Sequence, residues 1–264
     1  GASALAEAVV MACEQTRRKE FVLAAAVHPE YRETVATYTR PRGYQEVSLG
    51  YKDGVTDVEE AAGLVNDKTA ALVVQYPNFF GNVEDLKALA EVAHAKGALL
   101  VVAVVDPVSL GLLEAPGALG ADIVVGEGQS FGNHLSFGGP HIGFFAAKEK
   151  YVRRMPGRIV GVTVDNRGQR AFVLTLQARE QHIRREKATS NICSNQALNA
   201  LAVNIALTTL GKEGLREMAY QCLQKAHYAF KKLTSVPGVE PMFPGKPFFK
   251  EFVLKLAKDP EKVN

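Results

Sequence analysis

Cysteine is scarce in this chain of 264 residues, which has only Cys13, Cys193 and Cys222. An odd set of widely spaced cysteines, with no pair at the spacing of metal ligands, argues against a disulfide framework and predicts reduced thiols in a cytoplasmic protein without a metal site. Long apolar runs are also missing, since the longest covers only residues 97–105. A membrane-spanning helix needs ~20 residues, and no segment has the pattern of a signal peptide, so we expect no membrane partner.

The chain also lacks a strong charge of either sign. It has 31 Lys and Arg residues against 28 Asp and Glu, and the basic residues are spread along the sequence. The nearest basic run, residues 179–187, is interrupted by Glu180 and Glu186. We therefore expect no nucleic-acid partner. With 47% hydrophobic residues, the chain is long enough for one sizeable core and the start of a second domain.

The two ends of the sequence are unusual. It begins without Met, directly on the pattern of a helix start, and it ends at residues 260–264, shortly after one strand of what looks like a new unit. These features predict a fragment of a longer chain. An unusual but complete small protein is the alternative.

What the chain does have is an alternation of amphipathic helices with short strands rich in Val, Leu and Ala. We expect helices at residues 3–19, 28–39, 57–65 and 84–96, a short apolar run at residues 21–25, and strands at residues 44–49, 69–75, 98–105, 122–125 and 142–146. Ser3 would be the N-cap of the first helix, and Gly97 would end the fourth. Apolar strands separated by helices predict an α/β fold, with a mostly parallel sheet and helices on both faces.

Beyond residue 172 the pattern changes. A segment at residues 174–187 is followed by helices at 196–210 and 213–233 and by a strand at 249–254. A long helix of this kind commonly joins two lobes, and we place a boundary near Gly211. The expected domains are a large domain, residues 1–210, and the start of a smaller C-terminal domain, residues 211–264.

The segments that follow three central strands are the candidate site, because ligands of an open parallel sheet bind beyond the carboxyl ends of its strands. These segments are residues 76–81, 106–109 and 126–130, and they should converge on one crevice. Asp106 could cap the segment after it, or it could hold a pyridine nitrogen protonated so that a pyridoxal ring acts as an electron sink. Asn78 could be a turn former, or it could donate to a phenolate-like oxygen.

Two further residues have the same double interpretation. Ser3 could be a plain cap, or it could help Gly1 and Ala2 to bind a phosphate at the helix start. His28 could cap its own helix, or it could lie near an aromatic ligand. Taken together with Asp106, these residues point to pyridoxal-phosphate chemistry.

The lysine that this chemistry requires is missing where it should be. Residues 122–132 contain no lysine, and the position that faces the crevice is near Gln129 or Ser130, neither of which can replace an amine. The remaining candidates, Lys148, Lys150 and Lys187, have the pattern of surface residues. We therefore expect the crevice to lack a reactive amine and the chemistry to sit on a partner chain. A nicotinamide site is a weaker alternative, because the glycines of residues 126–132 are wrongly spaced for it.

Seven stretches carry a resemblance to a known family. They are residues 27–32, 53–57, 74–81, 126–130, 135–140, 153–161 and 176–193. On these stretches the chain resembles the P-protein of the glycine cleavage system, a glycine dehydrogenase (decarboxylating). Within that family it is most similar to the alpha subunit, subunit 1, of the split, two-chain form. The stretches cover almost the whole chain, and the last of them is highly specific.

The resemblance implies a fold-type I pyridoxal-phosphate architecture, like that of aspartate aminotransferase, shared by an alpha and a beta subunit in a heterotetramer. The beta subunit would carry the cofactor lysine. The complex would release the carboxyl group of glycine as carbon dioxide and pass the aminomethyl group to the lipoyl arm of the H-protein. Ser130 would stand where the partner has its lysine, so no catalytic residue is expected on this chain. The vestigial cofactor pocket would comprise Ser3, His28, Asn78, Asp106, Ser109, Gln129 and Ser130.

The basic region near residue 180 takes a second meaning from this resemblance. Its members would face a partner or line a substrate channel, where positive charge attracts carboxylates; they are Arg158, Arg184, Arg185, Thr189, Ser190 and Asn191. A plain solvated face is the alternative. Two other functions also stay open: a stand-alone pyridoxal-phosphate lyase or transferase, with Lys187 as the first suspected lysine, and a non-catalytic structural or regulatory homologue.

Overall fold

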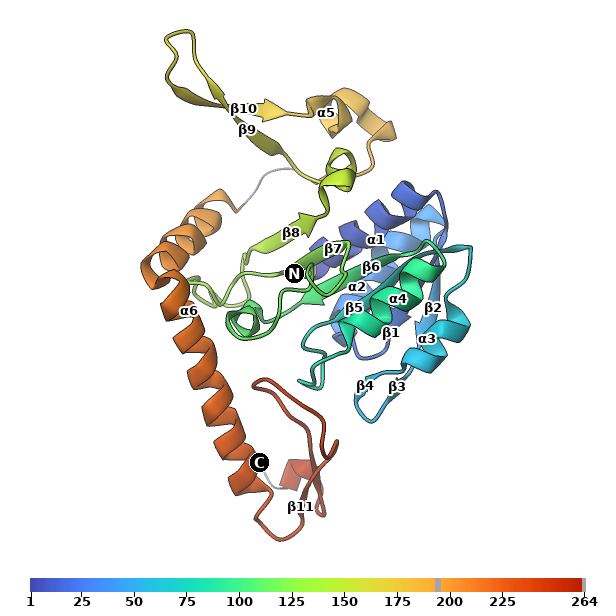
Figure 1. Ribbon diagram of the computed structural model, residues 1–264, viewed down its shortest axis with the longest axis vertical. Coiled ribbons are helices and arrows are strands. Elements are labelled where there is room, and N and C mark those ends of the chain that lie inside the picture. Colours follow the sequence, from blue (N-terminus) through green and yellow to red (C-terminus); the bar gives the residue numbers. More distant parts are fainter. Residues whose placement is uncertain (193–195, 263–264) are drawn as a thin grey trace.

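The computed structural model describes residues 1–192 and 196–262 (Figure 1). Its centre is a six-stranded sheet in the order β2-β1-β5-β6-β7-β8. The strands are β1 (Glu20–Ala24), β2 (Gln45–Leu49), β5 (Thr69–Gln75), β6 (Leu99–Val104), β7 (Ile123–Glu127) and β8 (Gly143–Ala147). Neighbouring strands are parallel except β7 and β8, which pair antiparallel. The predicted α/β fold with a mostly parallel sheet is confirmed.

Helices lie on both faces of this sheet. They are α1 (Ala2–Thr16), α2 (Pro29–Thr39), α3 (Val58–Leu64) and α4 (Leu86–Ala95). Helix α1 contacts β5, β6 and β7 and carries α2 on its outer side, whereas α4 covers β5 and β6 from the other face together with α3 (Figure 1). Every residue of β5 and β6 is buried as a result, which explains why β6 is wholly apolar and β5 is apolar between Thr69 and Gln75 at its two ends.

Capping residues set the starts of three helices. His28 precedes α2, and its Nδ1 accepts a hydrogen bond from the N–H of Glu30 at 3.3 Å. Asp57 and Asp85 cap α3 and α4 in the same way. The N-cap predicted at Ser3 is wrong, because α1 already begins at Ala2 and leaves Ser3 exposed in its first turn. The nitrogen of Gly1 donates to the carbonyl of Gly126 at 2.6 Å.

The structure contains two hairpins that the sequence pattern did not predict. One pairs β3 (Tyr51–Lys52) with β4 (Val55–Thr56), and the other pairs β9 (Ile159–Val164) with β10 (Arg170–Thr175). The β9–β10 hairpin projects away from the central sheet (Figure 1). After it come the short helix α5 (Gln181–Arg184) and the long helix α6 (Ala197–Leu233). The 3-10 turns are Arg40–Arg42, Pro107–Gly111, Glu149–Arg154, Gln177–Arg179, Arg185–Lys187 and Pro260–Lys262.

Helix α6 is interrupted at the glycine where the sequence predicts a break. Gly211 has φ 61° and ψ −175°, outside the helical region, so two helical segments meet there. The division of the chain into domains at this point stays a prediction. Beyond α6, β11 (Val239–Pro241) pairs antiparallel with β12 (Leu254–Leu256).

The strand predicted at residues 249–254 begins later in the structure, because β12 starts at Leu254, the last residue of that range. The stretch before it bonds to the loop after β5. The N–H of Phe249 donates to the carbonyl of Gly81 at 3.2 Å, and the N–H of Val83 donates to the carbonyl of Pro247 at 2.9 Å. We call residues 247–251 the docked segment, since these contacts hold it against the loop that follows β5.

Asp122 ties the start of β7 to neighbouring elements. Its side chain is 2% exposed, accepts the N–H of Leu100 at 3.0 Å, and pairs with His94 Nε2 at 2.7 Å and Lys148 Nζ at 2.9 Å. Burial by itself raises the pKa of Asp122, but the hydrogen bonds from Lys148, His94 and Leu100 outweigh burial and hold the pKa below its ordinary value of 3.8.

Replacing Asp122 by asparagine should therefore change both the stability and its dependence on pH. A carboxylate with a depressed pKa in the folded state adds stability above its unfolded pKa and loses it as the pH falls through the folded pKa. We expect Asp122→Asn to lower the free energy of unfolding by about 1–3 kcal/mol at neutral pH. We also expect the acid limb of the curve of stability against pH, the fall in the free energy of unfolding below about pH 4, to become less steep. Urea unfolding across this range measures both effects, with the exposed Asp67→Asn as the control. An acid limb equal to that of the unsubstituted chain would contradict this role.

Candidate functional site

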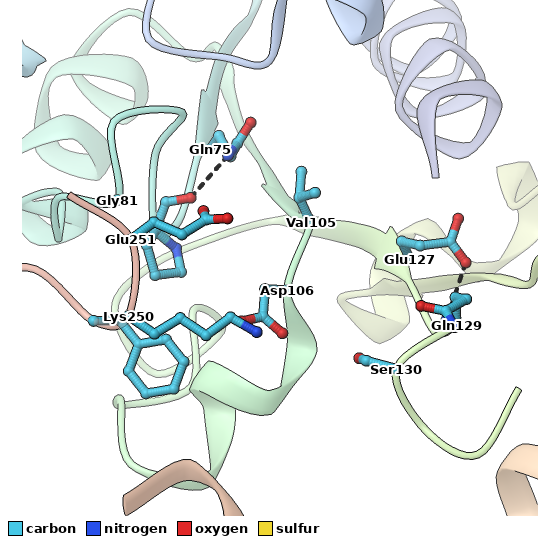
Figure 2. Close-up of a pocket in the computed structure, with 11 residues that line it drawn as sticks. Gln75, Gly81, Val105, Asp106, Glu127, Gln129, Ser130, Lys250 and Glu251 are labelled. Atoms are coloured by element: carbon cyan, nitrogen blue, oxygen red, sulfur yellow. Dashed lines mark hydrogen bonds and ion pairs between the residues drawn. The ribbon is translucent and has the colours of Figure 1, made fainter. Parts of the chain in front are cut away.

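A cavity of about 240 Å³ opens beyond the carboxyl ends of the central strands (Figure 2). It is lined by Gln75, Pro77, Gly81, Val105, Asp106, Glu127, Gln129, Ser130, Phe249, Lys250 and Glu251. The structure thus brings together the segments after β5, β6 and β7, which were predicted to converge. It also adds the docked segment, which the sequence did not place there.

Asp106 stands at the centre of this cavity and does two things at once. Its Oδ1 accepts a hydrogen bond from the N–H of Val108 at 3.3 Å, as expected of a cap on the turn that follows. Its Oδ2 lies 2.7 Å from Nζ of Lys250. Figure 2 shows the side chain of Lys250 extending toward this carboxylate. The two interpretations of Asp106 therefore do not exclude each other, because the residue both caps and faces the cavity.

The presence of Lys250 bears on one expectation. The crevice was predicted to lack a reactive amine, and the amine of this side chain lines it. The amine is ion-paired with Asp106 at 2.7 Å, and a protonated amine has no lone pair for a nucleophilic attack. No local pattern around residue 250 marks it as a site residue, since its place depends on contacts with a loop far away in the sequence.

Glu127 occupies the opposite side of the cavity, at the end of β7. Its Oε1 accepts the N–H groups of Gln129 and Ile142, both at 3.1 Å. Its Oε2 lies 3.5 Å from the nitrogen of Gly1, at the start of α1. The pKa of the nearby Tyr31 is raised to about 12. Burial is the main cause, and the negative charge of Glu127 adds to the shift. Sequence reasoning missed Glu127, although it lies inside the segment expected to hold the lysine.

Gln129 and Ser130 line the cavity where the sequence places the position of the missing lysine. The side-chain amide of Gln129 donates to the carbonyl of Asn133 at 2.6 Å, which turns it along its own loop. Ser130 points into the open space between Glu127 and Asp106 (Figure 2).

Asn78 does not line the cavity. It is 1% exposed, and its amide donates to the carbonyl of Gly54 and to Oε1 of Glu84, both at 2.7 Å. Its oxygen accepts the N–H groups of Phe80 and Asn82 at 3.0 and 3.1 Å. Since these bonds use both its donors and its acceptor, the structure gives Asn78 a role in shaping the loop after β5 and does not bring it to a ligand.

Three other candidate pocket residues also lie outside the lining. Ser109 is fully buried below Asp106 and donates to its backbone carbonyl at 2.7 Å. His28 caps α2, and its ring lies edge-on to Phe79 with centroids 5.1 Å apart. Ser3 is exposed on α1. Of the seven residues proposed from sequence, the structure brings Asp106, Gln129 and Ser130 to the cavity.

The basic region forms a second cavity of about 450 Å³ at the far end of α1. It is lined by Glu14, Arg42, Arg153, Arg154, Arg179, Arg184, Glu186, Lys187, Ala188 and Thr189. Arg184 and Thr189 are thus brought together, whereas Arg158 pairs with Glu180 at 3.5 Å and Arg185 lines a neighbouring cavity. Ser190 lines the small pocket next to it, and Asn191 is exposed.

Other kinds of site are not seen in the part of the chain that the structure describes. Residues 1–192 and 196–262 contain no cluster of three or more side chains suited to a metal ion. None of the helices described there combines the length and the apolar character of a membrane span. Cys13 and Cys222 are free thiols, and burial raises the pKa of Cys13 to about 12; Cys193 lies outside the described residues.

Comparison with known proteins identifies close relatives of the whole sequence. The family model "Glycine cleavage system P-protein" matches residues 1–263. The "Probable glycine dehydrogenase (decarboxylating) subunit 1" of Carboxydothermus hydrogenoformans is 59% identical over 99% of this chain and 58% of its own length. The protein of the same name from Brevibacillus brevis is 58% identical over 100% of this chain and 58% of its own length. The chain thus spans less than two thirds of the relatives that it matches.

Solved structures agree with this result. A crystal structure of glycine decarboxylase (P-protein) in an inhibitor-bound form superposes with a TM-score of 0.94 at 50% identity, covering 100% of this chain and 59% of that chain. A tetra mutant of the aspartate aminotransferase of Thermus thermophilus superposes with a TM-score of 0.59 at 17% identity, over 94% of this chain and 61% of that chain. The second match supports the fold alone, which is that of the fold-type I pyridoxal-phosphate enzymes.

Proposed function

The chain belongs to the glycine cleavage system P-protein family, and from this membership we propose that it acts in glycine decarboxylation as the alpha subunit of a two-chain enzyme. The observation that carries the proposal is identity of 59% to a relative named subunit 1, along nearly all of this chain. In this proposal the beta subunit holds pyridoxal phosphate, which supplies the electron sink for loss of the carboxyl group. The aminomethyl group then passes to the lipoyl arm of the H-protein, and the complex is cytoplasmic.

The absence of a lysine from residues 122–132 supports the division of labour between the two chains. Ser130 stands in this segment, at the cavity, where we propose that the partner has its lysine. Lys250 is the structural argument for the alternative, a stand-alone pyridoxal-phosphate enzyme. Its ion pair with Asp106 at 2.7 Å argues against that role, because it commits the amine to a carboxylate. Lys187 is exposed and lines the basic cavity instead of this one.

Exposed apolar side chains support the existence of a large partner. Val160, Val162, Phe172 and Leu174 face one side of the β9–β10 hairpin, since Val162 pairs directly with Phe172 and Val160 with Leu174. Their exposed fractions are 58%, 70%, 61% and 36%. A projecting strip of this kind is unfavourable in water and is typical of a protein interface. We propose that the beta subunit covers this strip.

Reconstitution tests the proposed function directly. The natural chain that contains this sequence, its partner chain and the H-protein would be purified separately and combined. We expect glycine-dependent release of carbon dioxide only when all three are present. Full activity of the partner chain with H-protein alone would contradict the proposal, and so would activity of this chain without the partner.

The basic cavity offers a second test, because we propose that it faces the partner subunit. Arg154→Glu/Arg184→Glu should slow association of the two subunits about tenfold at low salt and weaken the salt dependence of the rate, as expected when steering charges are reversed. Association rates measured at low and high salt check this result. Lys225→Glu/Lys231→Glu on the exposed face of α6 makes the same change in net charge elsewhere. Equal rates for the two double variants would exclude the basic cavity from the interface.

A further inference from the structure

A pyridoxal phosphate site has to satisfy two charges at opposite ends of the cofactor. The phosphate binds best at the backbone N–H groups of a helix start, and the pyridine nitrogen needs a carboxylate. This chain keeps both elements near the cavity of Figure 2. Asp106, which follows β6, lines it, and the start of α1 lies beside Glu127, which lines it too. Each of the two elements, however, already faces a charged side chain of the same polypeptide.

Asp106 faces Lys250. The carboxylate oxygen Oδ2 lies 2.7 Å from the ammonium, and the two side chains are only 19% and 32% exposed. A cationic group therefore already stands where a protonated ring nitrogen would have to approach. Because an ammonium and a pyridinium carry the same charge, Lys250 offsets the charge of Asp106 as a protonated ring nitrogen would, although its geometry does not make a hydrogen bond to Oδ2.

The position of Lys250 is built by the backbone around it. Two residues that precede Lys250 hold the docked segment against the loop after β5. The N–H of Phe249 donates to the carbonyl of Gly81, and the carbonyl of Pro247 accepts the N–H of Val83. The ring of Phe249 is 3% exposed and packs with Val108 and Ala219 in a small cluster of its own. Lys250 is thus held at the cavity by its anchored neighbours, unlike a lysine on an open surface.

Glu127 stands at the other end, where the phosphate would bind. The N–H groups of Gln129 and Ile142 fix one of its oxygens, and the other lies 3.5 Å from the nitrogen of Gly1. A phosphate at this helix start would meet a carboxylate of like charge. The cavity as a whole repels anions as well, since three carboxylates and one ammonium line it, those of Asp106, Glu127, Glu251 and Lys250.

We propose that Lys250 and Glu127 replace the two charged ends of pyridoxal phosphate and keep the pocket of this chain closed to the cofactor. The residues present do not fit the cofactor, because a charged side chain of this chain already faces each of its two anchoring points. The inference rests on the proposed function for its setting, a pair in which the partner holds the cofactor. It concerns only the pocket of this chain.

Counting cofactor in the assembled pair tests this proposal. Wild-type and variant pairs would be saturated with pyridoxal phosphate, and the bound cofactor would be released and counted per pair. We expect one cofactor per wild-type pair. In Glu127→Gln/Lys250→Met, loss of the like charge and release of Asp106 should tighten binding at this pocket at least tenfold, so that the count rises above one. Lys250→Arg with native Glu127 keeps both charges and should stay at one.

The control and a second variant keep the test decisive. Glu59→Gln/Lys225→Met makes the same chemical changes at exposed positions and should bind as the wild type does. If the double variant fails to fold, Glu127→Gln alone should still give a partial gain. A folded variant pair that stays at one cofactor would overturn the proposal, and so would a wild-type pair with a second cofactor in this cavity. Catalytic assays test the proposed function, whereas the cofactor count tests only the pocket of this chain. Either proposal can therefore be contradicted without the other.

Discussion

Replacing Gly81 by alanine should release the docked segment and destabilise the chain by about 2–4 kcal/mol. Gly81 has a φ of +85°, a backbone angle that residues with a side chain rarely adopt. In addition, a Cβ placed there would lie 1.9 Å from the backbone oxygen of Glu251. The backbone there has to move, so the bond from Phe249 to Gly81 at 3.2 Å is lost and Lys250 leaves Asp106. Urea denaturation measures the loss of stability.

Gly117→Ala is the matched control for this substitution. An added Cβ at Gly117 would have no neighbour within 4 Å, and the residue has no positive φ, so its replacement should leave the unfolding transition nearly unchanged. Reaction of Lys250 with an amine reagent adds an independent signal, because release of the docked segment should expose it. Equal stability of the two alanine variants, with Lys250 equally protected in both, would contradict the role given to Gly81.

Replacing Glu84 by alanine should cost about 3 kcal/mol or more, because it leaves buried donors without acceptors. Glu84 is 5% exposed and accepts the backbone N–H of Thr56 at 2.9 Å and the amide of Asn78 at 2.7 Å. Burial raises its pKa, while the hydrogen bonds from Asn78 and Thr56 oppose that shift. Without this acceptor the loop after β5 loses the group that fixes Asn78.

The measurement for Glu84 is the free energy of unfolding in urea, compared with that of Glu59→Ala on the exposed side of α3. Asn78→Ala should cost less than Glu84→Ala, because Glu84 retains its bonds to Thr56 when Asn78 is removed. A cost for Glu84→Ala no larger than that for Glu59→Ala would show that this network is not needed for stability.

The central sheet could be predicted from sequence because its strands are buried on both faces. The expected strand at 69–75 has the bounds of β5, since every residue from Thr69 to Gln75 is buried and the run is almost wholly apolar. The exposed β9–β10 hairpin was missed, although the alternation in residues 159–164 and the turn at 165–168 are a hairpin signal that could have found it. Strand-end residues such as Asp106 and Ser130 were placed because topology alone sends them to one edge.

The other half of the cavity could not be predicted, because it depends on contacts between distant segments. Lys250 reaches Asp106 only because Gly81 and Val83 bind the docked segment, and no periodicity in residues 247–251 encodes that docking. Asn78 was expected to face a ligand, but its buried partner Glu84 draws its amide away from the cavity. The direction of the Lys250 side chain thus depends on a loop far away in the sequence, and that of Asn78 depends on a buried hydrogen-bond network.

The most direct test is to trap the cofactor in the assembled two-chain complex with borohydride and map the labelled peptide by mass spectrometry. If turnover depends on an amine of the partner, the pyridoxyl group will be found on a lysine of the partner chain, and Lys250 will be unmodified. A pyridoxyl group on Lys250, or on any other lysine of this chain at the cavity, would contradict the proposed division between the two subunits.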